Sequence, residues 1–327
     1  MKTILTHKPG DASQLYLGDV PTPTPKSGEL LVEVKATSVN RADILQREGK
    51  YPPPAGESAV LGLDVAGIVA DASQGSGRFV TGDRVMALVG GGGYAEYALV
   101  PEELAMPIPA NLNFTAAAAI PEAFLTAYQA LFFIADLQAG QSVLIHAGAS
   151  GVGTAAIQLA KAASAAQIFV TVGSDDKMIF CESLGVDKAI NYKKNNFSDV
   201  ILEETQGRGV AVLVDFIGAP YWQHNIASLA LDGKMVLLAT MGGANVPDCN
   251  LRDIMRKRLQ INGSTLRARS LAYKIKLTKA FELFAHDRFF DESLRPIVDT
   301  VFPLAEVAEA HRYVEANLNR GKVVLAI

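Results

Sequence analysis

The stretch SVLIHAGASGVGTAAIQLAKAA, residues Ser142–Ala163, decides the fold of this chain. Its first part, Ser142–His146, is a short apolar run with β-branched side chains, which predicts a buried strand. Its last part places apolar side chains at the spacing of one helix face: Val152, Ala155, Ala156, Leu159, Ala160 and Ala163. A strand that turns through glycines into a helix collects unsatisfied N–H groups at the positive end of the helix dipole. The stretch therefore predicts an anion site, above all for a dinucleotide pyrophosphate.

The turn itself has the pattern G-x-S-x-x-G, from Gly148 to Gly153. Ser150 stands where dinucleotide-binding turns usually carry their middle glycine; it keeps the N–H group and adds a hydroxyl donor, but its Cβ takes up space. A tight strand–helix turn without a ligand is the alternative, and the flanking strand and helix favour the phosphate site. The candidate cofactor-binding residues here are Gly148, Ser150, Gly151, Val152 and Gly153.

Length and composition describe a globular chain of about two domains. Of 327 residues, 49% are hydrophobic and 20% are charged, and the net charge of −4 gives no reason to expect nucleic acid or a membrane surface as partner. Two cysteines, Cys181 and Cys249, make no disulfide framework. With no signal-peptide pattern and no run of ~18 apolar residues, we expect a cytoplasmic protein.

The order of expected elements divides the chain. Residues 1–120 contain short β segments between Pro- and Gly-rich turns, at 29–36, 66–70, 84–89 and 94–100. A helical connection begins at about Pro121. Strands at 142–148, 168–174, 188–192, 211–217 and 234–240 then alternate with helices at 151–163, 175–184 and 220–231. This alternation predicts a parallel doubly wound sheet. Amphipathic stretches at 270–286 and 304–317 and a strand at 322–327 follow.

Four motifs resemble the zinc-free quinone oxidoreductases of the medium-chain dehydrogenase/reductase superfamily, nearest to the tumour-suppressor-inducible branch and more distantly to the zeta-crystallins. They are NRADILQREGKY at 40–51, GLDVAG at 62–67, AAAIPEAFLTAYQAL at 117–131 and HAGASGVGTAAIQLAKA at 146–162. The resemblance implies an α/β protein: a Rossmann doubly wound parallel sheet at 122–265 and a mainly β, GroES-like catalytic domain at 1–121 and 266–327. It also implies NADPH, a cleft between the domains and a homodimer.

Metal ligands are missing from the positions where zinc members of the superfamily carry them. Their G-H-E-x-x-G motif matches Gly62–Gly67 here, and Leu63 replaces the histidine that binds the ion. The first cysteine, Cys181, lies in the Rossmann region. The five histidines show no ligand spacing, and each is expected at the surface or in a strand: His7, His146, His224, His286 and His311. We therefore expect no catalytic metal.

The choice between the two nicotinamide cofactors depends on the end of the second strand. NAD enzymes place an acidic residue about 20 residues beyond the glycines, and that position is Gly173 here. Ser174, Lys177 and Tyr192 offer a hydroxyl, an ammonium and a phenol to a 2′-phosphate, and the family resemblance implies the same use. Ser174 as N-cap would explain the acids at 175 and 176. An ordinary solvated charge cluster is the alternative; NADPH is favoured.

Asn40 and Tyr51 match family positions beside the nicotinamide and are the candidate catalytic residues. Tyr51 would donate its phenolic proton. Asn40 would orient either the carboxamide of the nicotinamide, as a cofactor-binding residue, or the substrate. The alternatives are that Asn40 only caps a helix and that Tyr51 only packs at a proline-rich turn. Thr126 matches a cofactor-contacting threonine, with a plain buried threonine as the alternative.

Two further stretches and the C-terminal region contain candidate residues. Gly90–Gly93 is predicted to be a mobile hairpin tip, with room for a flat aromatic acceptor as the alternative. Leu266 and Arg267 resemble the segment that covers the nicotinamide in the family, although Arg267 or Arg269 would also suit the surface. Near the C-terminal end of the chain, three side chains are candidates to reach the 2′-phosphate: Asn319, Arg320 and Lys322.

The sequence thus predicts NADPH-dependent, metal-free reduction of quinones by hydride transfer. The substrate would be a small quinone or another conjugated carbonyl, since an enone or 2-alkenal reductase is the second interpretation. A third is an NADPH-binding protein with a structural or regulatory role, by analogy with the zeta-crystallins.

Overall fold

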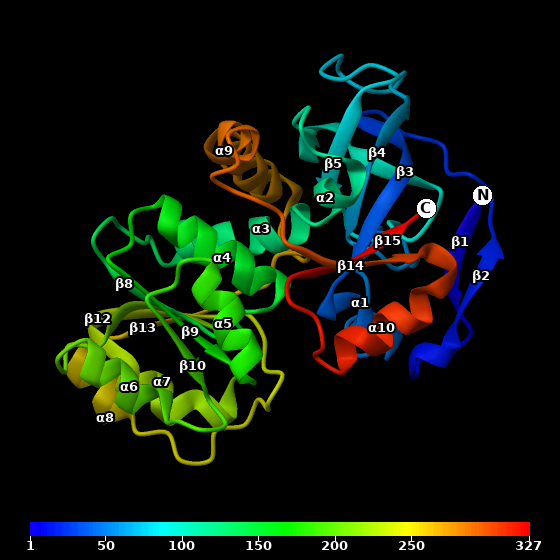
Figure 1. Ribbon diagram of the computed structural model, residues 1–327. Coiled ribbons are helices and arrows are strands. Elements are labelled where there is room, and N and C mark those ends of the chain that lie inside the picture. The colour runs from blue at the N-terminus through cyan, green and yellow to red at the C-terminus, as the bar shows by residue number, and fades with distance from the viewer. The chain divides into compact units, whose positions relative to one another are not determined.

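A computed structural model describes all 327 residues. The chain folds into two compact units (Figure 1). Unit 1 comprises Met1–Leu125 and Arg267–Ile327, and unit 2 comprises Thr126–Leu266. We describe each unit by itself.

Unit 2 contains a six-stranded sheet in the order β10-β9-β8-β11-β12-β13, with every neighbouring pair parallel. The strands are β8 (Ser142–Ile145), β9 (Gln167–Val172), β10 (Lys188–Asn191), β11 (Val210–Asp215), β12 (Leu229–Leu237) and β13 (Gln260–Gly263). When the six strands are numbered by their order along the chain, they lie across the sheet in the order 3-2-1-4-5-6, which is the Rossmann order. The direction in which successive strands are added reverses between β8 and β11. The carboxyl ends of those two strands form the edge at which such sheets bind ligands.

Helices cover both faces of this sheet, α4 and α5 on one and α6, α7 and α8 on the other (Figure 1). They are α4 (Gly151–Ala162), α5 (Asp175–Ser183), α6 (Phe197–Glu204), α7 (Trp222–Ser228) and α8 (Leu251–Lys257). The strands are apolar on both faces because both are covered; Val143, Leu144 and Ile145 of β8 are each 0% exposed. Helix α3 (Pro121–Tyr128), in which unit 2 begins, continues as a π-helix over Gln129–Ile134.

Unit 1 is mainly β. Its seven-stranded sheet has the order β14-β15-β3-β4-β5-β7, with β6 paired to β3. The strands are β3 (Glu29–Val39), β4 (Asp64–Asp71), β5 (Arg84–Leu88), β6 (Tyr97–Pro101), β7 (Ala105–Pro107), β14 (Val298–Pro303) and β15 (Lys322–Ala326). A separate antiparallel pair joins β1 (Lys2–Thr6) and β2 (Leu15–Asp19). The antiparallel pairing of β15 with β3 attaches the C-terminal segment to the N-terminal part of the chain.

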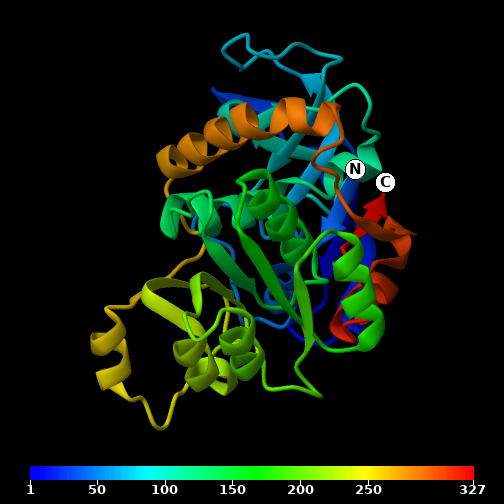
Figure 2. The same ribbon diagram turned by 60° about the vertical axis from the view of Figure 1, so that its left-hand side comes forward.

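The helices of unit 1 are α1 (Arg41–Arg47), α2 (Phe114–Ala118), α9 (Leu271–Phe290) and α10 (Val307–Glu315). Helix α9 is the longest, with 20 residues, and Figure 2 shows it along its length. It buries aromatic side chains of its inner face, and Phe281 and Phe289 pack against Phe124 at ring-centroid distances of 6.1 and 5.2 Å. Apolar packing of this kind fixes the segment after residue 266 onto unit 1.

The Rossmann sheet and the mainly β unit confirm the predicted fold class, but several boundaries were wrong. The helix expected at 220–231 ends at Ser228, because the Lys257 ammonium binds the carbonyl oxygens of Ile226, Ala227 and Leu229 at 2.6–2.9 Å and β12 follows at once. The strand expected from Tyr94 begins at Tyr97. The helices and strands not expected from the sequence are short: β1, β2, β7, α2, α6, α8, β13 and β14.

Candidate functional site

The glycine turn of unit 2 lies at the carboxyl end of β8, and its backbone is tightly folded. Ala147 has a left-handed φ of 50°, and its carbonyl oxygen accepts the N–H of Ser150 at 2.9 Å. A Cβ on Gly153 would lie 2.3 Å from that same oxygen, and a Cβ on Gly148 would lie 2.6 Å from the Val170 side chain. These two positions therefore require glycine to bring strand and helix together.

Ser150 is the N-cap of α4, and its hydroxyl oxygen accepts the Gly153 N–H at 3.0 Å. The expectation that Ser150 offers its backbone N–H to a ligand was wrong, because that group donates to Ala147. The N–H groups of Gly151 and Val152, at the first two helical positions, have no acceptor inside the helix. The turn thus suits a pyrophosphate, held by these two N–H groups and the Ser150 hydroxyl.

The structure brings the four expected 2′-phosphate residues together beyond β9 and β10. Ser174 is the N-cap of α5, as expected, and its hydroxyl accepts the Lys177 N–H at 3.4 Å. A Cβ on Gly173 would lie 3.0 Å from the Tyr192 hydroxyl. Asp175 is directed to Asn191 and Lys194, at 2.8 and 2.5 Å, so its charge is already balanced.

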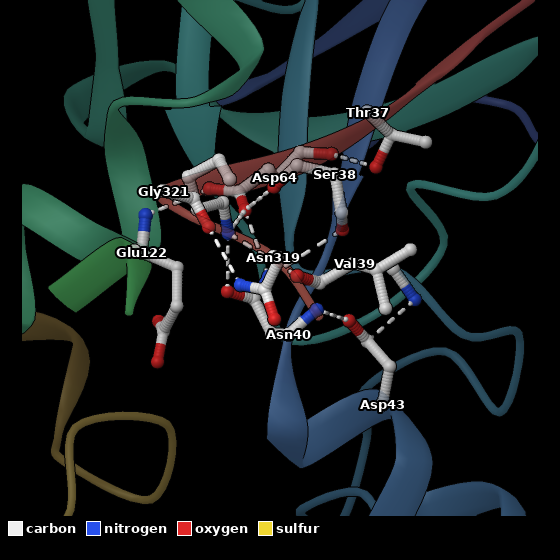
Figure 3. Close-up of polar contacts among 12 residues, drawn as sticks. Thr37, Ser38, Val39, Asn40, Asp43, Asp64, Glu122, Asn319 and Gly321 are labelled. Carbon is white, nitrogen blue, oxygen red and sulfur yellow. Dashed lines mark hydrogen bonds and ion pairs between the residues drawn. The ribbon is translucent and has the colours of Figure 1, made fainter. Parts of the chain in front are cut away.

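In unit 1 Asn40 is the N-cap of α1, as the capping alternative expected, and its side chain also belongs to a buried polar cluster (Figure 3). Its Nδ2 donates to Asp64 Oδ2 at 2.8 Å, and its Oδ1 accepts from Lys322 Nζ at 2.5 Å. Lys322 also lies 3.2 Å from Asp64 Oδ2. Asp64 further accepts the Ser38 hydroxyl and, at 2.7 Å, the N–H of Glu122. The network joins β3, β4, β15 and the first turn of α3.

Tyr51 and Arg267 lie together in unit 1. The Arg267 guanidinium is 5.5 Å from the centroid of the Tyr51 ring, and its Nε and Nη2 donate to the Gly90 carbonyl oxygen at 2.8 and 2.5 Å. Arg267 is only 6% exposed, so it is not a surface charge. Burial, followed by the charge of Glu122, raises the pKa of Tyr51, while Arg267 opposes that shift. Tyr51 therefore keeps its proton near neutral pH and is a hydrogen-bond donor.

The expectation of a mobile tip at Gly90–Gly93 was wrong, because this segment is packed inside unit 1. A Cβ on Gly91 would lie 2.5 Å from the Ser58 carbonyl oxygen, and one on Gly93 would lie 2.6 Å from that of Asp64. The glycines serve close backbone approach, and Gly90 anchors Arg267. Lys322 was also placed wrongly: it is 5% exposed and pairs with Asp64 inside unit 1, so its ammonium does not face a phosphate.

Thr126 and Leu266 stand at the two ends of unit 2, and both are buried, at 9% and 6% exposure. Asp64 was not singled out as a site residue from the sequence, and Lys322 was singled out only as a candidate ligand of the 2′-phosphate. Their signal was a lone charge in an apolar strand, in LGLDVAG and GKVVLAI respectively. Such charges are almost never fully buried unless they are paired.

Two histidines are buried, and His311, in helix α10, is neither in a strand nor at the surface as expected. Its Nδ1 lies 3.2 Å from Arg47, which can only donate, so its Nε2 carries the proton toward the Tyr94 hydroxyl at 3.1 Å. Burial and the Arg47 charge lower the pKa of His311 to about 3. His146 contacts Thr171 and Asn225, at 2.8 and 2.7 Å, and burial lowers its pKa to about 4. Both are structural, neutral imidazoles.

The side chains do not form a metal centre. No group of three or more His, Cys, Asp or Glu residues has the arrangement needed to hold an ion. Cys181 is buried and Cys249 is exposed. None of the helices combines the length and the apolar character that crossing a membrane requires.

Comparison with known proteins agrees with this geometry. Residues 26–110 match the alcohol dehydrogenase GroES-like domain, and residues 151–284 match the family described as zinc-binding dehydrogenase. A quinone oxidoreductase of Lama guanicoe is 30% identical over 330 residues, covering 100% of this chain and 98% of the relative.

Among solved structures, a quinone oxidoreductase of Pseudomonas syringae pv. Tomato DC3000 has a TM-score of 0.89 at 27% identity, covering 100% of this chain and 99% of its own. A mycobacterial protein solved in complex with NADPH has a TM-score of 0.87 at 29% identity, with 100% of both chains covered. The JamJ enoyl reductase has a TM-score of 0.88 at 26% identity, covering 99% of this chain and 98% of its own.

The chain therefore belongs to the medium-chain dehydrogenase/reductase superfamily of oxidoreductases, within its quinone oxidoreductase family. Its Rossmann unit and its GroES-like unit are those of the superfamily.

Proposed function

We propose that this protein reduces quinones with NADPH and without a catalytic metal, with unit 2 binding the cofactor and unit 1 carrying the catalytic groups. The main observation in support of the proposal is that unit 2 contains two sets of groups suited to bind anions. The glycine turn of α4 suits a pyrophosphate, and the Gly173, Ser174, Lys177 and Tyr192 set suits a 2′-phosphate. The names of the relatives, quinone oxidoreductase, support the acceptor.

The cofactor would be held by the first N–H groups of α4 at its pyrophosphate. Lys177, the Ser174 hydroxyl and Tyr192 would bind its 2′-phosphate. Gly173 has no carboxylate to repel that phosphate, which favours NADPH over NADH. Thr126, Leu266 and Arg267 are proposed contacts to the same cofactor. A structure of a mycobacterial relative with NADPH bound supports this choice.

When bound, NADPH supplies a hydride from its nicotinamide ring. Tyr51 donates a hydrogen bond from its phenol to the acceptor oxygen, where negative charge develops. The neighbouring Arg267 cation, fixed by the Gly90 carbonyl, favours that charge. Asn40, whose side chain is held by Asp64 and Lys322, would orient the nicotinamide carboxamide or the substrate.

Zinc independence is part of the proposal. Leu63 stands at the position of the metal-binding histidine, and the adjacent Asp64 is occupied by Ser38, Asn40, Lys322 and Glu122. A carboxylate with four donors is not available to an ion, and the donor set does not fit zinc.

The decisive experiment follows oxidation of NADPH, and separately NADH, with 1,4-benzoquinone and 9,10-phenanthrenequinone as acceptors. Turnover with NADPH and a much weaker reaction with NADH are expected. Binding of NADPH without turnover of any acceptor would refute the enzymatic proposal and favour the structural or regulatory role.

The second candidate is reduction of enones or 2-alkenals with the same cofactor. It is favoured by the similarity to an enoyl reductase, and quinones and enones are both conjugated carbonyls. A direct comparison of 9,10-phenanthrenequinone with a 2-alkenal under equal conditions separates the two. A homodimer in the cytoplasm completes the proposal, supported by the family resemblance, and light scattering tests the oligomeric state.

A further inference from the structure

The guanidinium of Arg267 is buried in unit 1 and forms no ion pair. Its Nε and Nη2 donate to the Gly90 carbonyl oxygen, whereas its Nη1 is buried and has no hydrogen-bond partner. Three acids, Asp43, Glu122 and Glu57, act on this cation through their charges only. Buried charges are usually paired, so Arg267 is a cation whose charge is not neutralised by contact.

The charge of Arg267 acts on the phenol of Tyr51. The guanidinium carbon lies 5.5 Å from the centroid of the Tyr51 ring. Burial, followed by the charge of Glu122, raises the pKa of Tyr51, and Arg267 lowers it. A cation in contact with a carboxylate would have a weaker effect, because the two charges of an ion pair largely cancel at a distance. Since donor strength rises with acidity, the unpaired cation strengthens the hydrogen bond that Tyr51 donates.

Glu57 is the acid best placed to neutralise Arg267. Its carboxyl group packs against Gly90, the residue that holds the guanidinium, and a Cβ on Gly90 would overlap it. The carboxylate is paired elsewhere, because Glu57 Oε1 lies 3.7 Å from the ammonium of Lys274 in helix α9. Lys274 is 9% exposed, so its charge is held at this place by the packing of the helix. Lys274 therefore competes with Arg267 for the same carboxylate.

We propose that Lys274 is a positioning residue for the reaction: by pairing with Glu57 it leaves Arg267 without a carboxylate partner, so that the guanidinium charge acts on the phenol of Tyr51. This inference rests on the proposed function, because Tyr51 is the group that donates to the acceptor oxygen there. It gives a role to an ion pair that makes no contact with Tyr51 itself.

The test measures the pKa of Tyr51 without cofactor or acceptor. The protein is produced with 3,5-difluorotyrosine, whose phenol ionises nearer neutral pH than that of tyrosine, and its fluorine resonances are followed against pH. The resonance of residue 51 is assigned by its loss in Tyr51→Phe. Arg267→Met should raise this pKa by about one pH unit or more. Lys274→Met should raise it by at least about half as much, because the released Glu57 carboxylate then pairs with Arg267.

A double-variant cycle separates this pairing from the independent action of the two charges. Glu57→Gln alone should change the pKa of Tyr51 by less than about 0.3 pH unit, because the Glu57 charge is already paired. Adding Glu57→Gln to Lys274→Met should restore the wild-type pKa. Equal and opposite effects of the two single variants would mean that each charge acts on Tyr51 by itself, and would overturn the inference.

Lys279→Met is the matched control, because Lys279 lies on the same helix and pairs with Glu103 at 3.0 Å. It should leave the pKa of Tyr51 unchanged. Turnover of 1,4-benzoquinone with NADPH should fall severalfold in Lys274→Met and recover in the double variant, with the KM for NADPH unchanged.

The cycle on Glu57 and Lys274 decides the question even if Arg267→Met does not fold. An unchanged pKa of Tyr51 in Lys274→Met would overturn the inference whether or not the protein reduces quinones. The expected set of pKa values without turnover of any quinone would support the inference for Tyr51 and refute the proposed function.

Discussion

Replacing Lys177 with alanine is expected to weaken NADPH binding by about tenfold or more and to leave NADH binding almost unchanged. The reason is that Lys177 is the cation of the set that also contains Gly173, Ser174 and Tyr192. The change leaves the local fold in place, because the bond from residue 177 to the Ser174 hydroxyl comes from the backbone N–H, at 3.4 Å.

The magnitude follows from the position of Lys177 in the first turn of α5. A charge-assisted hydrogen bond contributes about 1.5–3 kcal/mol, which is roughly 10- to 150-fold in affinity. Lys177 is half-buried, so solvent screening favours the lower end of this range. Helix α5 itself should not be destabilised, because a cation at a helix N-terminus opposes the dipole and alanine has the highest helix propensity.

The assay measures dissociation constants for NADPH and NADH by cofactor fluorescence, together with urea unfolding. Lys188→Ala is the control, since Lys188 opens β10, pairs with Glu204 at 2.8 Å and lies at the opposite end of that strand from Tyr192. It removes the same charge from the same unit and should change NADPH affinity less than twofold. Equal losses for the two cofactors, or equal effects of the two variants, would show that the 2′-phosphate does not bind at Lys177.

Three further predictions concern the chemistry and the stability of the protein. Tyr51→Phe should lower turnover of small quinones by about 10²-fold with nearly unchanged NADPH affinity; unchanged turnover with quinones of both high and low reduction potential would remove the phenol from the mechanism. Exhaustive dialysis against a chelator should leave activity intact, and elemental analysis should find less than about a tenth of a zinc ion per chain; stoichiometric zinc would contradict this. His311→Gln keeps an acceptor for Arg47 and a donor for Tyr94. Because the folded-state pKa of His311 is lowered to about 3, the unfolded chain binds its proton first as the pH falls. The stability advantage of the wild type over His311→Gln should therefore be complete above about pH 6.5 and shrink below it, by at most about 1.4 kcal/mol per pH unit. Urea unfolding at pH 7 and pH 5 measures this, and a difference that does not change with pH would contradict it.

Local patterns in the sequence were sufficient for the first strand, turn and helix of the Rossmann sheet. The run Ser142–Ala163 combines a buried strand, a glycine turn and a helix within 22 consecutive residues, and the structure has β8, the turn and α4 at those positions. The same holds for Ser174 as an N-cap, because capping depends on neighbours three residues away. Short edge elements such as β13 were missed, since a strand of four residues depends on pairing with β12 rather than on its own pattern.

In unit 1, local sequence patterns did not predict which segments pack together. Gly90–Gly93 has the composition of an exposed turn, yet it is packed against Ser58 and Asp64. Composition describes which backbone conformations are permitted, but not which distant segment approaches a glycine. Nothing in the local sequence says that Arg267 would bind the Gly90 carbonyl, 177 residues away.

The sequence by itself determined the class of protein and showed that Leu63 replaces the metal-binding histidine. It also predicted the nicotinamide cofactor. These depend on residue types at short, fixed spacings. Only the tertiary structure decided what Asn40 and Lys322 contact. Lys322 stands 282 residues from Asn40, and the antiparallel pairing of β15 with β3 brings the two side chains to 2.5 Å. Burying an ammonium requires an anion and hydrogen-bond acceptors at the same place, and such a set is assembled by sheet pairing between segments whose separation along the chain carries no local signal.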